Sequence, residues 1–418
     1  MSAQGLSAAK FQEVAKNEAN VLTRFREKGH PHLIRAIASY TKERRHFFVF
    51  PWAKGGNLRE FWKSQPSLST ASLSFSVQDW ADYLNWFFSQ LTGLAGAIKT
   101  LHYPPNESGH SCRHGDLKPE NILCFGRHEP GPGAIPRHVK LIIADAGHAS
   151  VHEQATAIRL LPTKTQGGTR MYSPPEAELQ LGEARSRRYD IWSLGCLYFE
   201  FLIWILYGNT VLNEFHSAIG NGQPYYDKDE GVELKDTVKD WIVHIRGDPR
   251  CLPSGLTALG RLLDLIEDRL LVVNIKTRIN SFSQYNGMRH PSSSSGNIPD
   301  MVLTRPTVDI REPLPERADA KEMCEEMEKI LAAAQRGGSL PWMNWDGMAD
   351  AAKWGPPRVV SNLSPHSRSG SVEAAIENEL TIKVRFLSRC SIKIQVLPNI
   401  LRTPSLNHWR YVYKICWK

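Results

Sequence analysis

Closely spaced cysteines are missing from this 418-residue chain. Its seven cysteines lie far apart, and none belongs to the CxxC or CxxH pairs that are typical of zinc sites. We therefore expect reduced, buried thiols, as in an intracellular protein. The first residues, MSAQGLSAAKFQE, also lack the apolar core of a signal peptide. These absences argue against secretion and favour a cytoplasmic or nuclear location.

The chain also lacks a long run of like charges. Its formal net charge is +8, but the Lys and Arg residues are scattered along the sequence. We therefore expect no dedicated nucleic-acid partner. Hydrophobic residues make up 41% of the chain and charged residues 22%, as in soluble globular proteins. No internal repeat of solenoid length is present, and the length suits two or three domains, or one two-lobed domain with an extension.

One apolar run tests the membrane question. The run from Ile191 to Tyr207 is almost wholly apolar, but it contains Glu200 and has about the minimum length of a membrane span. A helix buried on all sides inside a large domain has the same composition. We favour the buried helix.

Apolar periodicity predicts a mainly helical chain with a few strands. A polar, Ser- and Pro-rich stretch at 280–316 predicts a flexible insertion, and alternation near 380–397 predicts a hairpin in an otherwise irregular tail. The expected helices are 11–25, 78–102, 191–207, 237–245, 256–273 and 319–335, and the expected strand pairs are 33–40 with 47–52 and 122–125 with 139–143.

The segment HGDLKPEN, residues 114–121, carries side chains suited to phosphoryl transfer. One carboxylate orients an attacking hydroxyl, a cation offsets charge on the transferred group, and oxygen ligands hold magnesium against the phosphates. Asp116, Lys118 and Asn121 fit these three roles. Asp145 follows a strand-like run and precedes a glycine, which makes it a candidate second magnesium ligand.

Four motifs together resemble the signatures of a eukaryotic protein kinase catalytic lobe. They are HGDLKPEN, DAG, GTRMYSPPE and YDIWSLG, in this order. The resemblance implies an α+β kinase fold, with a mainly helical C-lobe and a truncated N-lobe, that uses ATP and Mg²⁺. Lys118 favours serine/threonine specificity. The segment YDIWSLGCLYFEF and the PPE motif are similar to kinase-like proteins of filamentous fungi.

The resemblance also assigns individual roles. It makes Asp116 and Lys118 catalytic, and it places Asn121 and Asp145 on the metal. Asp190 becomes the buried aspartate that holds the catalytic loop, so 191–207 becomes the central core helix and a membrane span is rejected. Expected nucleotide-site residues are Glu18, Phe50, Trp52, Ala53, Asn57 and Leu123, and expected structural residues are His114, Glu176, Asp190 and an arginine partner of Glu176.

That arginine has two candidates, because an unpaired carboxylate inside a lobe is costly. Arg278 and Arg317 both follow the helix that ends near Val273. We prefer Arg317, which begins a pattern similar to the end of such domains. The kinase-like domain then covers 1–335, with an N-lobe remnant at 1–53 and a C-lobe at 54–335, and 336–418 forms a tail.

Three departures from the family pattern leave the function open. The chain starts almost at the helix that carries Glu18, and we expect neither Lys10 nor Lys16 to act as the ATP-binding lysine of a preceding strand. Ala146 stands where the pattern has phenylalanine, and Gly115 where it has arginine.

The sequence therefore supports two hypotheses. The first is an active serine/threonine kinase, and the second is an impaired pseudokinase or shortened kinase that binds proteins. A third, weaker idea treats the terminal HWRYVYKICWK as a nucleic-acid or membrane contact, for which a solvated tail is the preferred alternative. The protein substrate and the oligomeric state are not identified.

Overall fold

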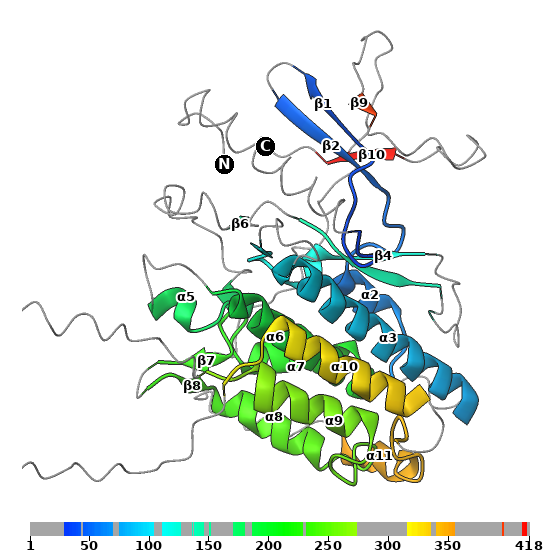
Figure 1. Ribbon diagram of the computed structural model, residues 1–418. Helices are drawn as coiled ribbons and strands as arrows, with labels where there is room; N and C mark the ends of the chain where they lie inside the picture. Colours follow the sequence, from blue (N-terminus) through cyan, green and yellow to red (C-terminus); the bar gives the residue numbers. More distant parts are fainter. Residues whose placement is uncertain are drawn as a thin grey trace, which may run out of the picture.

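The computed structural model shows a small antiparallel sheet above a helical body (Figure 1). This arrangement confirms the predicted α+β class, with a mainly helical lower lobe. The model describes residues 29–42, 45–69, 75–103, 111–126, 136, 138–145, 150–151, 170–179, 186–228, 231–273, 316–335, 340–355, 395–396 and 412–415.

The upper sheet is built around the hairpin of β1 (Ala38–Lys42) and β2 (Arg45–Pro51). The two strands pair in antiparallel register, and the rings of Tyr40 and Phe47 stack with centroids 4.8 Å apart. The sequence predicted that the first strand begins at Leu33. In the structure it begins at Ala38. Leu33 instead forms an isolated parallel bridge with Ile143 of the lower lobe.

Two short strands from the end of the chain complete this sheet. β9 (Gln395–Val396) pairs with β1, and β10 (Val412–Ile415) pairs with β2, so the strand order is β10-β2-β1-β9. The hairpin predicted at 380–397 lies mostly outside the described residues. The end of the chain was expected to be a solvated tail, but its described part adds a strand beside β2.

Helix α3 (Val77–His102) forms the longest element of the lower lobe. Ser76 caps its start reciprocally with Asp79, as in a capping box. Its apolar stripe is buried, and α10 (Ala320–Gln335) packs alongside it, with the Thr92 hydroxyl 3.4 Å from the carbonyl of Met327. Figure 1 shows these two helices side by side.

Helix α6 (Arg188–Tyr207) runs through the middle of the lobe. Its length and hydropathy would allow a membrane span, but this apolar stretch is completely buried inside the described fold. The prediction of a core helix is therefore confirmed.

The remaining elements surround this core. A hairpin of β4 (Ile122–Phe125) and β5 (Lys140–Ile143) forms as predicted. The tail contains a short helix, α11 (Met348–Trp354), where no regular structure was expected. The other described elements are α2 (Leu58–Ser64), β3 (Cys112–Arg113), η1 (Pro119–Asn121), β6 (Ser150–Val151), η3 (Arg170–Tyr172), α5 (Glu176–Leu179), α7 (Asn209–Ala218), β7 (Tyr226–Asp227), β8 (Glu233–Leu234), α8 (Asp236–Arg246), α9 (Ala258–Leu265) and the π-helical turn η4 (Ile266–Leu270).

A buried ion pair joins α5 to the segment before α10. Arg317 is 0% exposed, and its two terminal nitrogens lie 2.7 and 3.3 Å from the Glu176 carboxylate. The guanidinium also donates to the carbonyl of Val272 and lies over the Trp192 ring, 4.9 Å from its centroid. This is the partner that the sequence favoured; residue 278 lies outside the described residues.

We expect Arg317→Met to lower the free energy of unfolding by about 3–5 kcal/mol, because it leaves the Glu176 carboxylate buried without its cation. Urea unfolding of the full chain measures the loss. The exposed Arg261 provides a matched control, Arg261→Met, which should change stability by less than about 0.5 kcal/mol. A loss below about 1 kcal/mol for Arg317→Met would show that the pair is not structurally important.

A second close contact holds His32, which precedes β1, against β5 and α3. The His32 imidazole donates from Nδ1 to the carbonyl of Leu141 at 2.7 Å, and burial lowers the pKa of this imidazole to about 4. The ring lies directly against Gly93, where an added Cβ would come within 2.2 Å of Nε2. Only glycine leaves room for the ring at this position.

Gly93→Ala should therefore destabilise the fold by about 1–3 kcal/mol, since the His32 ring must move out of a packed site. The alanine alone would favour the helix by about 1 kcal/mol. Thermal or urea unfolding measures the net effect. In the His32→Ala background the same substitution should cost nothing; a Gly93→Ala protein as stable as the parent contradicts the close contact.

Candidate functional site

The loop that follows β3 holds Asp116 in a defined orientation. Its side chain is only 4% exposed. Its Oδ2 atom accepts from Lys118 Nζ at 2.7 Å and from Asn121 Nδ2 at 3.1 Å. Its other oxygen, Oδ1, is buried and has no hydrogen-bond partner in the described part of the chain. The carboxylate is thus fixed through one oxygen and can accept a proton at the other.

His114 ties this loop to the segment before Asp145. Its Nε2 atom donates to the carbonyl of Ala144 at 3.0 Å, so Nδ1 can accept from the backbone N–H of Asp116, 3.3 Å away. The backbone N–H of Ala144 in turn donates to the carbonyl of Asn121 at 2.8 Å. One set of hydrogen bonds therefore positions both Asp116, the candidate base, and the segment that leads into Asp145.

Asp190 anchors the loop from below. It is 0% exposed, and its two oxygens accept the backbone N–H groups of His114 and Gly115, each at 2.8 Å. The Nε2 atom of His102 lies 2.8 Å from Oδ2. Burial alone would raise the pKa of Asp190, but the hydrogen bond from His102 and nearby positive groups, such as Arg113, lower it overall. The carboxylate is ionised near neutral pH.

Asn121 and Asp145 offer a suitable donor set for magnesium. The Asn121 amide donates from Nδ2 to Asp116, so its carbonyl oxygen is the atom that would face a metal ion. Asp145 is the one non-glycine residue with positive φ, at 67°, among the described residues. Such a conformation costs energy and is concentrated at functional sites. Within the described ranges, no group of three or more His, Cys, Asp or Glu side chains could hold a metal ion by itself. A magnesium ion here would complete its shell with phosphate oxygens and water.

The predicted nucleotide contacts lie on two neighbouring segments. Phe50 is half-buried at the end of β2, and Trp52 just beyond it is 50% exposed. Asn57 forms a bridge with Leu123 of β4, so the structure brings these two residues together. The Asn57 side chain, however, caps α2 by accepting the N–H of Glu60 at 3.1 Å. Its amide is engaged in the fold, and the nucleotide role assigned to it stays a prediction.

Other predicted residues fall outside the described ranges. They include Glu18 and Ala146.

A polar network beside the loop was missed by the sequence analysis. Arg59 of α2 donates to Glu120 at 2.6 Å and to the Tyr172 hydroxyl at 3.0 Å. That hydroxyl donates to Glu200 of α6 at 2.9 Å, and Tyr225 donates to the same carboxylate at 2.9 Å. Glu200 was visible as the one charge in an apolar run, and Glu120 lies inside HGDLKPEN. Their link through Arg59 and Tyr172 had no local signal.

The chain resembles known proteins over the part that contains this site. The protein kinase domain model matches residues 4–223, slightly more than half of the chain. An Aurora kinase of Dictyostelium discoideum is 31% identical over 216 residues, which cover 51% of this chain and 46% of the relative.

Two further relatives are more distant. The MAP kinase-interacting serine/threonine-protein kinase 2 of Xenopus laevis is 27% identical over 178 residues, 42% of this chain and 32% of the relative. The serine/threonine-protein kinase PKH3 of Eremothecium gossypii is 26% identical over 200 residues, 47% of this chain and 23% of the relative. The chain spans less than half of the length of each of these relatives. The family match, the helical lobe and the fixed aspartate of the HGDLKPEN loop agree, and the chain belongs to the protein kinase family.

Proposed function

We propose that this chain transfers the γ-phosphoryl group of ATP to a serine or threonine hydroxyl of a protein. The observation that carries the proposal is the Asp116 carboxylate, whose Oδ2 is held by Lys118 and Asn121 while the buried Oδ1 has no partner in the described structure. A substrate hydroxyl that donates to Oδ1 would satisfy this atom. Asp116 would then orient the hydroxyl and take its proton as the new P–O bond forms.

Lys118 and the two metal-ligand candidates support the same reaction. Lys118 lies beside Asp116, where its charge can offset the negative charge on the transferred group. Asn121 and Asp145 would hold magnesium, which when bound neutralises the phosphate oxygens. The serine/threonine preference rests on Lys118 and on two of the relatives, which are both named serine/threonine-protein kinases.

The alternative function is that of a protein-binding pseudokinase. It is favoured by Gly115 and Ala146, which stand where the family pattern has an arginine and a phenylalanine. In this alternative the helical lobe serves as a docking surface, and the fixed Asp116 has no reaction to perform. The two functions differ in nucleotide binding and in phosphate transfer, which are measured separately.

Asp116→Asn should reduce phosphate transfer by at least about 10²-fold, because a neutral amide cannot accept the hydroxyl proton. Transfer of labelled phosphate from ATP to a general substrate such as dephosphorylated casein measures the rate. Asp240→Asn, an exposed substitution on α8, is the matched control and should keep the parent rate. Equal rates for Asp116→Asn and the parent would rule out Asp116 as the base, whereas no transfer by the parent would favour the pseudokinase.

Mg-ATP should raise the melting temperature by several degrees, because a ligand that binds only the folded state stabilises it by about 2.7 kcal/mol at one hundred times its Kd. Asp145→Ala should abolish the magnesium-dependent part of this shift. Asp227→Ala, which removes a carboxylate that is mostly exposed, should keep it. No shift in the parent protein would favour the binding module, and a full shift in Asp145→Ala would remove Asp145 from the metal site.

A further inference from the structure

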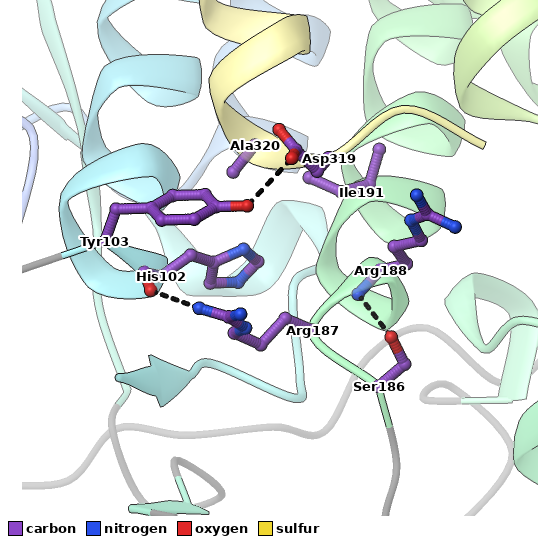
Figure 2. A pocket seen from close by; sticks show the side chains of 8 residues that line it. All are labelled: His102, Tyr103, Ser186, Arg187, Arg188, Ile191, Asp319 and Ala320. Atoms are coloured by element: carbon purple, nitrogen blue, oxygen red, sulfur yellow. Dashed lines mark hydrogen bonds between the residues drawn. The ribbon is translucent and has the colours of Figure 1, made fainter. Parts of the chain in front are cut away.

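A polar cavity lies at the meeting point of three helices, away from the Asp116 carboxylate. It encloses about 210 Å³ between the end of α3, the start of α6 and the start of α10. A water molecule takes roughly 30 Å³ in the liquid, so the cavity has room for a group of several heavy atoms. Figure 2 shows its walls, which are formed by His102, Tyr103, Ser186, Arg187, Arg188, Ile191, Asp319 and Ala320.

Two arginines line this cavity, and their guanidinium groups point in different directions (Figure 2). Arg187 is held in place, because its Nη1 donates to the carbonyl of His102 at 2.5 Å and its Cζ lies 5.0 Å from the centroid of the Tyr103 ring. Arg188 is held loosely: its Nη2 lies 3.6 Å from the Glu316 carboxylate, and its side chain is 29% exposed. One arginine is therefore fixed by the fold, and the other can turn toward a ligand.

The acidic wall residue, Asp319, forms no ion pair with either arginine in the described structure, although the positive charge of Arg188 acts on its carboxylate. One of its oxygens accepts the backbone N–H groups of Lys321 and Glu322, at 2.7 and 3.0 Å. The other accepts the Tyr103 hydroxyl at 2.8 Å, an interaction that Figure 2 also shows. The Asp319 carboxylate thus caps the first backbone N–H groups of α10. Arginine pairs are well suited to phosphate, because their planar N–H groups bind its oxygens in pairs.

The cavity connects directly to the catalytic loop. His102, whose carbonyl holds Arg187, places its ring against the Asp190 carboxylate at 2.8 Å. The same carboxylate accepts the backbone N–H groups of His114 and Gly115. A ligand that binds Arg187 is therefore separated from the loop backbone by only two side chains, His102 and Asp190. This path runs through the carbonyl and the ring of His102 and then through Asp190, and such packed, hydrogen-bonded groups can carry coupling between two sites.

We propose that this cavity is a second binding site, specific for a phosphate group, and that its occupation stabilises the catalytic loop through His102 and Asp190. Phosphate binding in this cavity does not require nucleotide binding or the phosphate transfer proposed above. Its ligand is a phosphate monoester or free phosphate, bound by the guanidinium groups of Arg187 and Arg188.

Binding can be tested by calorimetric titration of the full chain with inorganic phosphate, without nucleotide or magnesium and at constant ionic strength set with sodium chloride. Arg188→Gln should weaken binding about tenfold or more, as expected for the loss of charge-assisted hydrogen bonds. Arg261→Gln removes the same charge from an exposed position of α9, where the side chain donates only to Gly255 in the described structure. This control should bind phosphate as the parent does.

A short phosphoserine peptide identifies the source of the phosphate group. Tighter binding of this peptide than of inorganic phosphate assigns the site to a phosphorylated protein segment, and equal affinities assign it to the free anion. Asp145→Asn should leave both affinities unchanged, which separates this cavity from the nucleotide site. Weak sites have Kd values of about 1 mM, so both probes are tested up to about 20 mM. The proposed site would be overturned if neither probe binds at this concentration. Equal weakening of binding by Arg188→Gln and Arg261→Gln would also overturn it.

Hydrogen exchange tests the coupling. Saturating phosphate should slow exchange of the His114 and Gly115 amides in the parent protein, because both donate to Asp190. In Arg188→Gln the slowing should require about tenfold more phosphate. Phosphate binding that leaves these two amides unchanged would overturn the coupling.

Discussion

The geometry of the site depends on one buried carboxylate. Asp190 lies at 0% exposure, and such a charge is stable only if its oxygens are satisfied. The loop that carries Asp116 supplies two successive N–H groups, from His114 and Gly115, and this requires an unusual backbone turn. Gly115 has a φ of 82°, a conformation that glycine adopts without steric cost. The glycine that departs from the family pattern is therefore well suited to the turn that Asp190 imposes.

The same constraint extends from the loop to the metal-ligand candidates. Because Asp190 fixes residue 114, the His114 ring reaches the carbonyl of Ala144, and Asp145 follows directly in its positive-φ conformation. On the other side, Glu120 is held through Arg59 and Tyr172 to Glu200 in the same core helix. Helix α6 thus supports both sides of Asp116. An apolar helix that could have been taken for a membrane span carries the two acids that position the site.

The sequence was sufficient where the signal is local or belongs to an ordered motif. The periodicity of α3, the hairpin of β4 and β5, and the spacing of Asp116, Lys118 and Asn121 can all be read from neighbouring residues. The arginine partner of Glu176 could be narrowed to two candidates by the cost of burying a charge. The Arg59–Tyr172 link could not be predicted, because its members lie on elements whose contact depends on the completed fold. The late start of β1 has the same cause, since Leu33 pairs with Ile143 across the lobes.

The upper sheet shows how far such long-range contacts can determine a site. A two-stranded hairpin is marginally stable alone, and its unpaired edges invite association with other chains. β9 and β10 close both edges of the β1–β2 hairpin with residues from the end of the chain. β10 pairs with Phe50 and Pro51, which lead into Trp52 and Ala53, two of the expected nucleotide-site residues. Pairing strands so far apart in the sequence costs loop-closure entropy. This cost rises only slowly with loop length, so it is little larger than for a shorter loop. The strand that precedes the predicted nucleotide contacts is therefore supported by residues that local sequence patterns assign to a tail.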